Sequence, residues 1–211
     1  MIIDLHTHSS VSDGTDTPSE LMHRAALAQL GVVALTDHDT TDGWQEAAAV
    51  VEQTGVGLVR GTEISTTCRG ISVHLLAYLH DPTHPGLVAA LAQSRSSRNT
   101  RAQHMVEKLS EDFPITWADV QAQAGWGVTI GRPHIADALV EKGVIDNRSE
   151  AFSHILSPRG PYYVRYETPD LGEAIGLVRQ AGGVPVLAHI RASARGRIIN
   201  DDDIAALVPL G

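Results

Sequence analysis

Two histidines near the start of the chain, His6 and His8, are separated by a single residue. In an extended strand the side chains at positions i and i+2 lie on the same face, so both imidazoles can reach one metal ion. Two unrelated polar residues at the end of a strand would give the same spacing, and an isolated pair does not separate the two interpretations. The meaning of the pair therefore depends on the other histidines and carboxylates of the chain.

Five more residues with metal-binding side chains accompany the expected strands. His38, Glu63 and His189 close strands, His74 lies inside one, and Asp13 is in a glycine-containing loop. Together with the first pair they exceed what one ion takes from a protein, so we expect two or three divalent ions. Glu63 is the expected bridge, because one carboxylate can bind two cations. Imidazoles with carboxylates suit manganese, zinc or iron rather than calcium. The donor types do not choose among these three metals, and manganese is the one that we expect.

Three aspartates, Asp4, Asp37 and Asp39, lie beside these candidate ligands. We expect them to orient imidazoles through hydrogen bonds, as carboxylates commonly do around metal sites. The alternative is that they are caps and loop carboxylates, since aspartate is frequent in turns.

Short apolar segments alternate with helical ones over the first third of the chain, and residues 2–6, 32–36 and 57–62 are the expected strands. Strands that alternate with helices of this length predict right-handed parallel crossovers, in an α/β barrel or a doubly wound sheet. In both folds the functional groups gather at the carboxyl ends of the strands, which is where several of the candidate ligands fall.

The first intervening helix is expected to begin at Thr17, because Glu20 completes a capping box, and to stop at Gly31. The second is expected over residues 42–53, with Gly55 as its stop.

After a fourth expected strand over residues 71–79 the pattern becomes helical, and a strand returns only at residues 184–189. We therefore expect residues 1–84 and 184–211 to form an α/β core and residues 85–183 to be a helical insertion. Helices are expected in the insertion over residues 87–94, 98–111, 117–124, 133–142, 149–156 and 170–181.

The composition excludes several kinds of site and partner. The formal net charge is −9, and residues 1–84 hold three arginines against eleven carboxylates, a net −8, so binding of duplex DNA through a basic surface is not expected. Cys68 is the only cysteine, which excludes an internal disulfide and a thiolate zinc site. No apolar segment approaches the ~20 residues that span a bilayer, and the start of the chain lacks a signal-peptide pattern, so a cytoplasmic protein without a membrane partner is expected.

Four ordered motifs give the chain a resemblance to a known family. They are His6-Thr7-His8-Ser9 with Ser12-Asp13-Gly14, Leu35-Thr36-Asp37-His38-Asp39, Gly61-Thr62-Glu63-Ile64 and Leu187-Ala188-His189. Over nearly its whole length the chain resembles the PHP (polymerase and histidinol phosphatase) family, whose fold is a distorted (β/α)7-type barrel with a trinuclear metal site. The resemblance implies one ion on His6, His8 and Glu63, a second on Glu63, His74 and His189, and a third on Asp13 and His38.

One part of the family pattern is absent. The family adds an aspartate and a histidine from a late strand with a Ser-Asp-x-His type motif, whereas this chain reaches Gly211 before any such motif. It also shows five expected strands where the family has seven. We therefore expect a barrel that is incomplete at its C-terminal side, and the sequence favours a fragment of a longer reading frame over a degenerate protein.

The helical insertion, with the segment Gly131-Arg132-Pro133-His134-Ile135-Ala136, resembles the branch of the family that acts on 3′,5′-bisphosphonucleosides and short RNA 5′ ends. Arg98 and Arg101 are expected to open a helix on one face, where an anion would offset their unfavourable position in the helix dipole. A solvated basic face is the alternative for the arginines, and a core position is the alternative for His134. The resemblance implies substrate contacts from Arg98, Asn99, Arg101, Arg132 and His134.

The sequence thus predicts a metal-dependent phosphoesterase in which a hydroxide that bridges the metal ions attacks phosphorus. The expected substrates are small nucleotide phosphates, namely 3′,5′-bisphosphonucleosides, nucleoside monophosphates or short RNA 5′ ends. Two alternatives stay open. One is a histidinol-phosphate phosphatase or amidohydrolase-like hydrolase, and the other is a noncatalytic fragment that binds nucleotide or metal.

Overall fold

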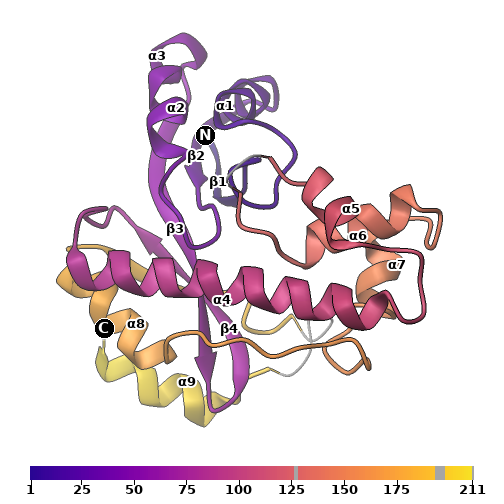
Figure 1. Ribbon diagram of the computed structural model, residues 1–211. Helices are drawn as coiled ribbons and strands as arrows, with labels where there is room; N and C mark the ends of the chain where they lie inside the picture. Colours follow the sequence, from indigo (N-terminus) through magenta and orange to yellow (C-terminus); the bar gives the residue numbers. More distant parts are fainter. Residues whose placement is uncertain (126–127, 193–197, 211) are drawn as a thin grey trace. The chain divides into compact units, whose positions relative to one another are not determined.

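Figure 1 shows the computed structural model of the chain, which describes residues 1–125, 128–192 and 198–210. These residues divide into two units. The first contains Met1–Ser94, Thr168–Ala192 and residues 198–210, and the second lies within Arg95–Glu167. All the strands of the described chain belong to the first unit, and the second is helical.

A mixed sheet forms the centre of the first unit. Its strands are β1 (Ile2–Thr7), β2 (Leu30–Leu35), β3 (Gly57–Cys68), β4 (Ile71–Tyr78) and β5 (Val184–Ala188). They pair in the order β1-β2-β3-β4-β5. The first three run parallel, as the alternation with helices predicts, whereas β4 is antiparallel to β3 and β5 is antiparallel to β4.

The third strand is longer than predicted. The sequence pattern placed Glu63 just after the strand's end at residue 62, and that prediction is wrong, because β3 continues to Cys68. The strand changes partner on the way. Residues up to Arg60 pair with β2, and Gly61–Cys68 pair with β4 through a tight turn of two residues with positive φ. The β-branched residues after Glu63 favour this extension, so Glu63 lies within the sheet and not at a strand's end.

Helix α1 (Pro18–Leu27) begins as predicted and ends earlier. Thr17 and Glu20 form the capping box. The stop predicted at Gly31 is wrong, because the chain leaves the helix before Gln29, whose φ is 59°, and Gly31 is already inside β2. Gly31 instead lets the side chain of Met1 pack against the backbone of β2, because a Cβ at Gly31 would lie 2.4 Å from Cγ of Met1.

Two apolar clusters pack helices against the sheet. In one, α1 packs against β2, and α2 (Trp44–Ala49) packs against α1 and β3. The single helix predicted over residues 42–53 is wrong, because Val50 leaves the helical conformation and separates α2 from α3 (Val51–Thr54). The stop predicted at Gly55 is confirmed. In the other cluster, α8 (Leu171–Gln180) packs on β3, β4 and β5. The last described elements are α9 (Asp201–Leu207) and a 3-10 turn at Val208–Leu210. Buried side chains of these clusters include Met22, Val33, Leu35 and Trp44, and Leu75, Leu171, Ile175 and Val178.

The helical unit contains the second half of α4 (Pro85–Leu109), one continuous helix of 25 residues. The prediction of two separate helices, over residues 87–94 and 98–111, is wrong. Neither glycine nor proline lies between residues 94 and 98, so nothing in the sequence interrupts the helix there. Arg98 and Arg101 therefore lie in the middle of a helix and not at its start. Three shorter helices share an apolar core with α4, namely α5 (Trp117–Ala122), α6 (Arg132–Glu141) and α7 (Arg148–Ser153).

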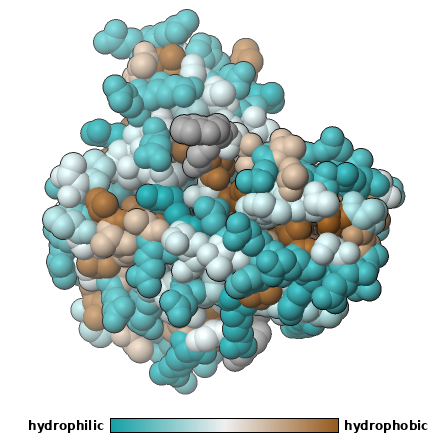
Figure 2. Space-filling model, in the orientation of Figure 1, coloured by the Kyte–Doolittle hydropathy of each residue, from teal (hydrophilic) through white to brown (hydrophobic). Residues whose placement is uncertain are grey.

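No helix in the described ranges combines the length and the apolarity that crossing a membrane requires. The longest, α4, is rich in arginine, serine and glutamine. In the space-filling view of Figure 2, hydrophilic residues cover most of the visible surface, and apolar residues form separate areas on it.

His80 predicts a pH dependence of stability. Its ring is buried beside Trp44, with the ring centroids 5.0 Å apart. Nδ1 lies 3.2 Å from the carbonyl oxygen of Ala77, and Nε2 has no hydrogen-bond partner among the described residues. Burial lowers the pKa of His80 and outweighs the Ala77 carbonyl, which raises it. As the pH falls, His80 therefore takes up a proton at a higher pH in the unfolded chain than in the folded chain. The free energy of unfolding should consequently fall as the pH drops below about 6.5.

The variant His80→Asn keeps a nitrogen that can donate to the Ala77 carbonyl but does not titrate. Its free energy of unfolding should therefore fall less than that of the wild type between pH 7.5 and pH 5.5, as measured by urea denaturation. Equal losses in the two proteins would contradict a neutral, buried His80.

Candidate metal centre

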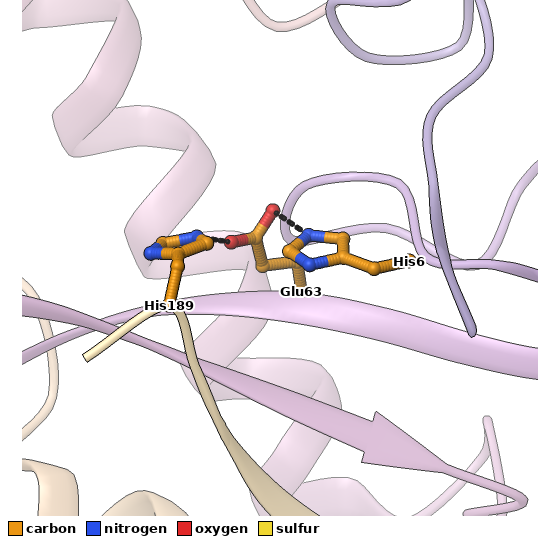
Figure 3. A group of neighbouring side chains, drawn as sticks. All are labelled: His6, Glu63 and His189. Atoms are coloured by element: carbon orange, nitrogen blue, oxygen red, sulfur yellow. Dashed lines mark hydrogen bonds and ion pairs between the residues drawn. The ribbon is translucent and has the colours of Figure 1, made fainter. Parts of the chain in front are cut away.

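Glu63 is the centre of the histidine cluster, and only 1% of its surface is exposed. Oε2 lies 3.0 Å from Nε2 of His6 and 2.9 Å from Nε2 of His8. Oε1 lies 2.7 Å from Nδ1 of His74 and 2.9 Å from Nε2 of His189. Figure 3 shows His6 and His189 on the two sides of the carboxylate, one at each oxygen. A single buried carboxylate is thus surrounded by imidazoles from several strands.

His38 and Asp13 extend the cluster on the His8 side. Nε2 of His38 lies 3.4 Å from Oε2 of Glu63 and 3.6 Å from Oδ2 of Asp13. Oδ1 of Asp13 lies 3.5 Å from Nδ1 of His8. The structure therefore brings all the predicted metal ligands together in the first unit.

The sheet explains why these side chains meet. His6 is near the end of β1, and His189 directly follows β5 with a left-handed φ of 35°. His38 follows β2 and forms an isolated parallel bridge with Glu63. His74 is in β4, opposite Ser65, and therefore lies on the same face of the β3–β4 pair as Glu63.

The aspartates beside the ligands mostly bind backbone amides and hydroxyls. Asp37 accepts from the backbone amide and hydroxyl of Ser9 (2.7 and 2.6 Å) and from the hydroxyl of Ser12 (2.6 Å). Asp39 accepts from the backbone amide and hydroxyl of Ser65. The prediction that Asp37 orients an imidazole through a hydrogen bond is therefore wrong: it anchors the loop after β1, which carries His8 and Asp13. These serines were missed as partners, although they stand inside the sequence motifs.

The cluster sets the charge of Glu63. Burial alone would raise the pKa of this carboxyl, but the charge of His38 and the hydrogen bonds from His189, His6 and His74 lower it far below its usual range. At His8, burial lowers the pKa, and the hydrogen bond to Glu63 with the charge of Asp13 more than reverses this, so the pKa is raised. Glu63 is thus an ionised carboxylate in a nearly dry site.

The donor set fits divalent metal ions. Two groups of ligand atoms each lie within 4.8 Å of one another, and Glu63 belongs to both. Imidazole nitrogens with one shared carboxylate are the donors that manganese, zinc and iron bind in proteins. The division of the seven residues among individual ions stays a prediction. The groups are His6, Glu63 and His189, and His8, His38 and Glu63.

The helical unit has a cluster of buried arginines. Arg98 and Arg101 are each only 7% exposed, so a solvated basic face is the wrong interpretation for both. The Arg101 guanidinium lies 4.9 Å from the ring centroid of Tyr163 and 4.6 Å from that of Tyr166, and its Nε donates to a backbone carbonyl. The expectation that an anion offsets the dipole of a helix start is also wrong, because both arginines are within α4.

Arg132 lies in the same cluster. Its guanidinium is over the ring of Phe152, at 5.3 Å, and Nη1 donates to the Leu156 carbonyl. Burial lowers the pKa of Arg132 to about 10, and the charge of Arg101 adds to the shift. None of the charges that shift the pKa values of Arg101 and Arg132 is a carboxylate. Two guanidinium groups, those of Arg101 and Arg132, thus lie close enough for the charge of one to lower the pKa of the other.

Asn99 and His134 fix the start of α6. Oδ1 of Asn99 accepts from the backbone amide of Ile130 at 2.7 Å, and Nδ1 of His134 accepts from that of Gly131 at 3.1 Å. His134 is buried, which agrees with the core position considered as an alternative. All five predicted substrate contacts belong to the helical unit.

A family model described as PHP domain matches residues 4–121. The chain belongs to the PHP family. It is 37% identical over 187 residues to a 5′-3′ exoribonuclease of Haemophilus influenzae, covering 88% of this chain and 68% of the relative. It is 35% identical over 204 residues to a 3′,5′-nucleoside bisphosphate phosphatase of Chromobacterium violaceum, covering 93% of this chain and 70% of the relative.

Two solved structures agree with the fold. A candidate metal-dependent phosphoesterase from Bifidobacterium adolescentis superposes with a TM-score of 0.96 at 44% identity, covering 99% of this chain and 74% of that one. A protein from Chromobacterium violaceum described as an amidohydrolase, with bound sulfate and no metal, gives 0.89 at 33% identity, covering 99% and 72%. The family, the incomplete α/β barrel and the reaction class expected from the sequence, metal-dependent hydrolysis of phosphate esters, are thereby confirmed.

Proposed function

We propose that this PHP chain hydrolyses phosphate esters of nucleotides with divalent ions bound around Glu63. One observation carries the proposal, namely the convergence of five imidazoles on a buried, ionised carboxylate. The substrates we propose are 3′,5′-bisphosphonucleosides, nucleoside monophosphates and short RNA 5′ ends. Their support comes from the relatives, whose names specify a nucleoside bisphosphate phosphatase and a 5′-3′ exoribonuclease.

The chain's own residues prepare the site. Glu63, His6, His8, His38, His74, His189 and Asp13 would hold the ions. Divalent ions, when bound, lower the pKa of water and neutralise phosphoryl oxygens, which supplies the nucleophile and stabilises the transition state. The imidazoles already lie around Glu63, and the nitrogens that donate to it would release their protons when they bind ions. We propose manganese ahead of zinc or iron; a cytoplasmic location stays a prediction from the sequence.

We further propose that the arginine cluster binds anionic groups of the substrate. The support comes from the helical unit alone. In the described part of the chain, neither the buried Arg101 nor the half-buried Arg132 forms an ion pair with a carboxylate, and Nη2 of Arg101 has no hydrogen-bond partner there. A phosphate accepts two parallel hydrogen bonds from a guanidinium, so it suits donors of this kind.

A comparison of substrates tests the proposed function. The purified chain is assayed with Mn²⁺ on a 3′,5′-bisphosphonucleoside, a 5′-labelled RNA trinucleotide, histidinol phosphate and an amide substrate. We expect turnover of the nucleotides, at least about 10-fold lower after His38→Ala. Preferential turnover of histidinol phosphate or of the amide would replace the proposal with another hydrolase. Nucleotide binding without turnover would identify a noncatalytic module.

Removal of divalent ions is expected to abolish turnover and to weaken nucleotide binding. The first 84 residues carry a net charge of −8, which repels an anionic substrate until cations neutralise the site. Isothermal titration with a nonhydrolysable bisphosphonucleoside analogue, in Mn²⁺ and in excess EDTA, measures the difference. Tight binding in EDTA would count against the mechanism.

A further inference from the structure

Strand β1 is irregular where it enters the histidine cluster. The pairs of residues opposite each other in β1 and β2 include Asp4 with Val33 and Thr7 with Leu35. Between these two pairs, β1 has two residues, 5 and 6, whereas β2 has only residue 34. Strand β1 therefore contains one extra residue here, which forms a β-bulge. Bulges re-aim side chains next to active sites. Here the side chain concerned is that of His6.

Two side chains hold the bulged peptide. The hydroxyl of Tyr78 donates to the carbonyl oxygen of Leu5 at 2.7 Å. The backbone amide of His6 donates to Oδ1 of Asp4 at 3.1 Å. Both polar groups of the Leu5–His6 peptide are thus satisfied by side chains at the place where the β1–β2 register skips these residues.

Tyr78 reaches this peptide from a distant strand. It lies in β4, four residues after His74 and so on the same face of the strand. β2 and β3 separate β4 from β1 in the sheet, so the hydroxyl reaches β1 from a strand that is not its neighbour. Gly61, opposite Tyr78 in β3, leaves room for the ring, because a Cβ there would lie 3.0 Å from Cδ1 of Tyr78. The glycine and the tyrosine therefore fit each other.

The phenol stays a donor at neutral pH. Burial raises the pKa of Tyr78, and the negative charges of Glu63 and Asp4 raise it further. The hydroxyl therefore keeps its proton and its bond to Leu5 at neutral pH.

We propose that Tyr78, seated against Gly61, is a positioning residue that holds the β1 bulge and so places the imidazole of His6 against Glu63. The inference rests on the proposed metal centre. In this role Tyr78 acts through the Leu5–His6 peptide, while Asp4 holds the other side of that peptide.

The test is a double-mutant cycle on Mn²⁺ binding, measured by isothermal titration without substrate. Tyr78→Phe removes only the hydroxyl and is expected to weaken Mn²⁺ binding about 10-fold, as loss of a group that orients a ligand commonly does. In a His6→Ala background the same change should have no further effect, because the ligand that Tyr78 positions is gone. Tyr162→Phe is the matched control. It removes a phenol bonded to Asp112 in the helical unit and should leave Mn²⁺ binding unchanged.

Asp4→Ala gives a second test at an exposed residue, where folding is not at risk. Asp4→Ala should also weaken Mn²⁺ binding about 10-fold. In the His6→Ala background it should have no further effect on Mn²⁺ binding. Wild-type affinity in both single variants, or equal losses with and without His6, would overturn the inference. Mn²⁺ binding without nucleotide turnover in the wild type would overturn the proposed function alone, whereas a wild type that binds no Mn²⁺ would overturn both.

Discussion

Replacing Glu63 by glutamine is expected to lower kcat/KM for a nucleotide phosphate ester by at least ~1,000-fold, which corresponds to ~4 kcal/mol of transition-state stabilisation. Glu63 belongs to both groups of candidate ligand atoms, so one substitution weakens both. Glutamine has the same shape but carries no charge, and its amide nitrogen would face an imidazole. Turnover of a 3′,5′-bisphosphonucleoside at saturating Mn²⁺ measures the effect.

Glu52→Gln provides the matched control, because Glu52 is an exposed residue of α3 in the same unit. It should keep the wild-type rate. Circular dichroism of Glu63→Gln separates loss of the site from loss of the fold. A folded Glu63→Gln variant that retains more than a tenth of the activity would show that Glu63 is not the shared ligand.

The second large effect is expected at Arg101. Replacement by alanine should lower kcat/KM for a 3′,5′-bisphosphonucleoside by about 10- to 100-fold, as expected for hydrogen bonds to a charged group worth roughly 1.5–3 kcal/mol. The two tyrosine rings hold the guanidinium in place, so little side-chain entropy is lost when an anion binds. Arg101→Lys keeps the charge but not the planar fork, so we expect an intermediate loss.

The matched control is Arg159→Ala, an exposed arginine of the same unit, which should behave as the wild type. A smaller loss for a nucleoside monophosphate than for the bisphosphonucleoside would show that the cluster recognises a second phosphate. If Arg101→Ala lowers the melting temperature and leaves KM unchanged for both substrates, the cluster is structural and the proposed anion site is wrong.

The residues of the candidate metal centre could be predicted because their signals are local. The His-x-His spacing, and histidines that follow apolar segments, identify the candidate ligands, and the parallel strands β1 to β3 bring the ends of such segments to one edge. The capping box of Thr17 and Glu20 is equally local and is confirmed. The candidate ligands and the cap are therefore identified by near neighbours, whereas the pairing of the strands brings the ligands together.

Errors arose where distant partners determine the structure. Glu63 lies within β3 because β4 returns to pair with the second half of that strand. The β-branched residues after Glu63 permit this extension, but the partner strand that requires it comes later in the chain. The break predicted before Arg98 is a different kind of error, because neither glycine nor proline interrupts the segment and α4 is continuous there. The role of Tyr78 was not predicted, because the tyrosine contacts Leu5, which lies 73 positions away in the sequence.

Diffraction from crystals grown with Mn²⁺, recorded at the manganese absorption edge, tests the central claim most directly. The account predicts at least two anomalous peaks, each within bonding distance of a Glu63 oxygen and of imidazole nitrogens from His6, His8, His38, His74 or His189. Their loss in Glu63→Gln crystals grown in the same way would confirm the assignment. Peaks elsewhere on the chain, with none at Glu63, would contradict it.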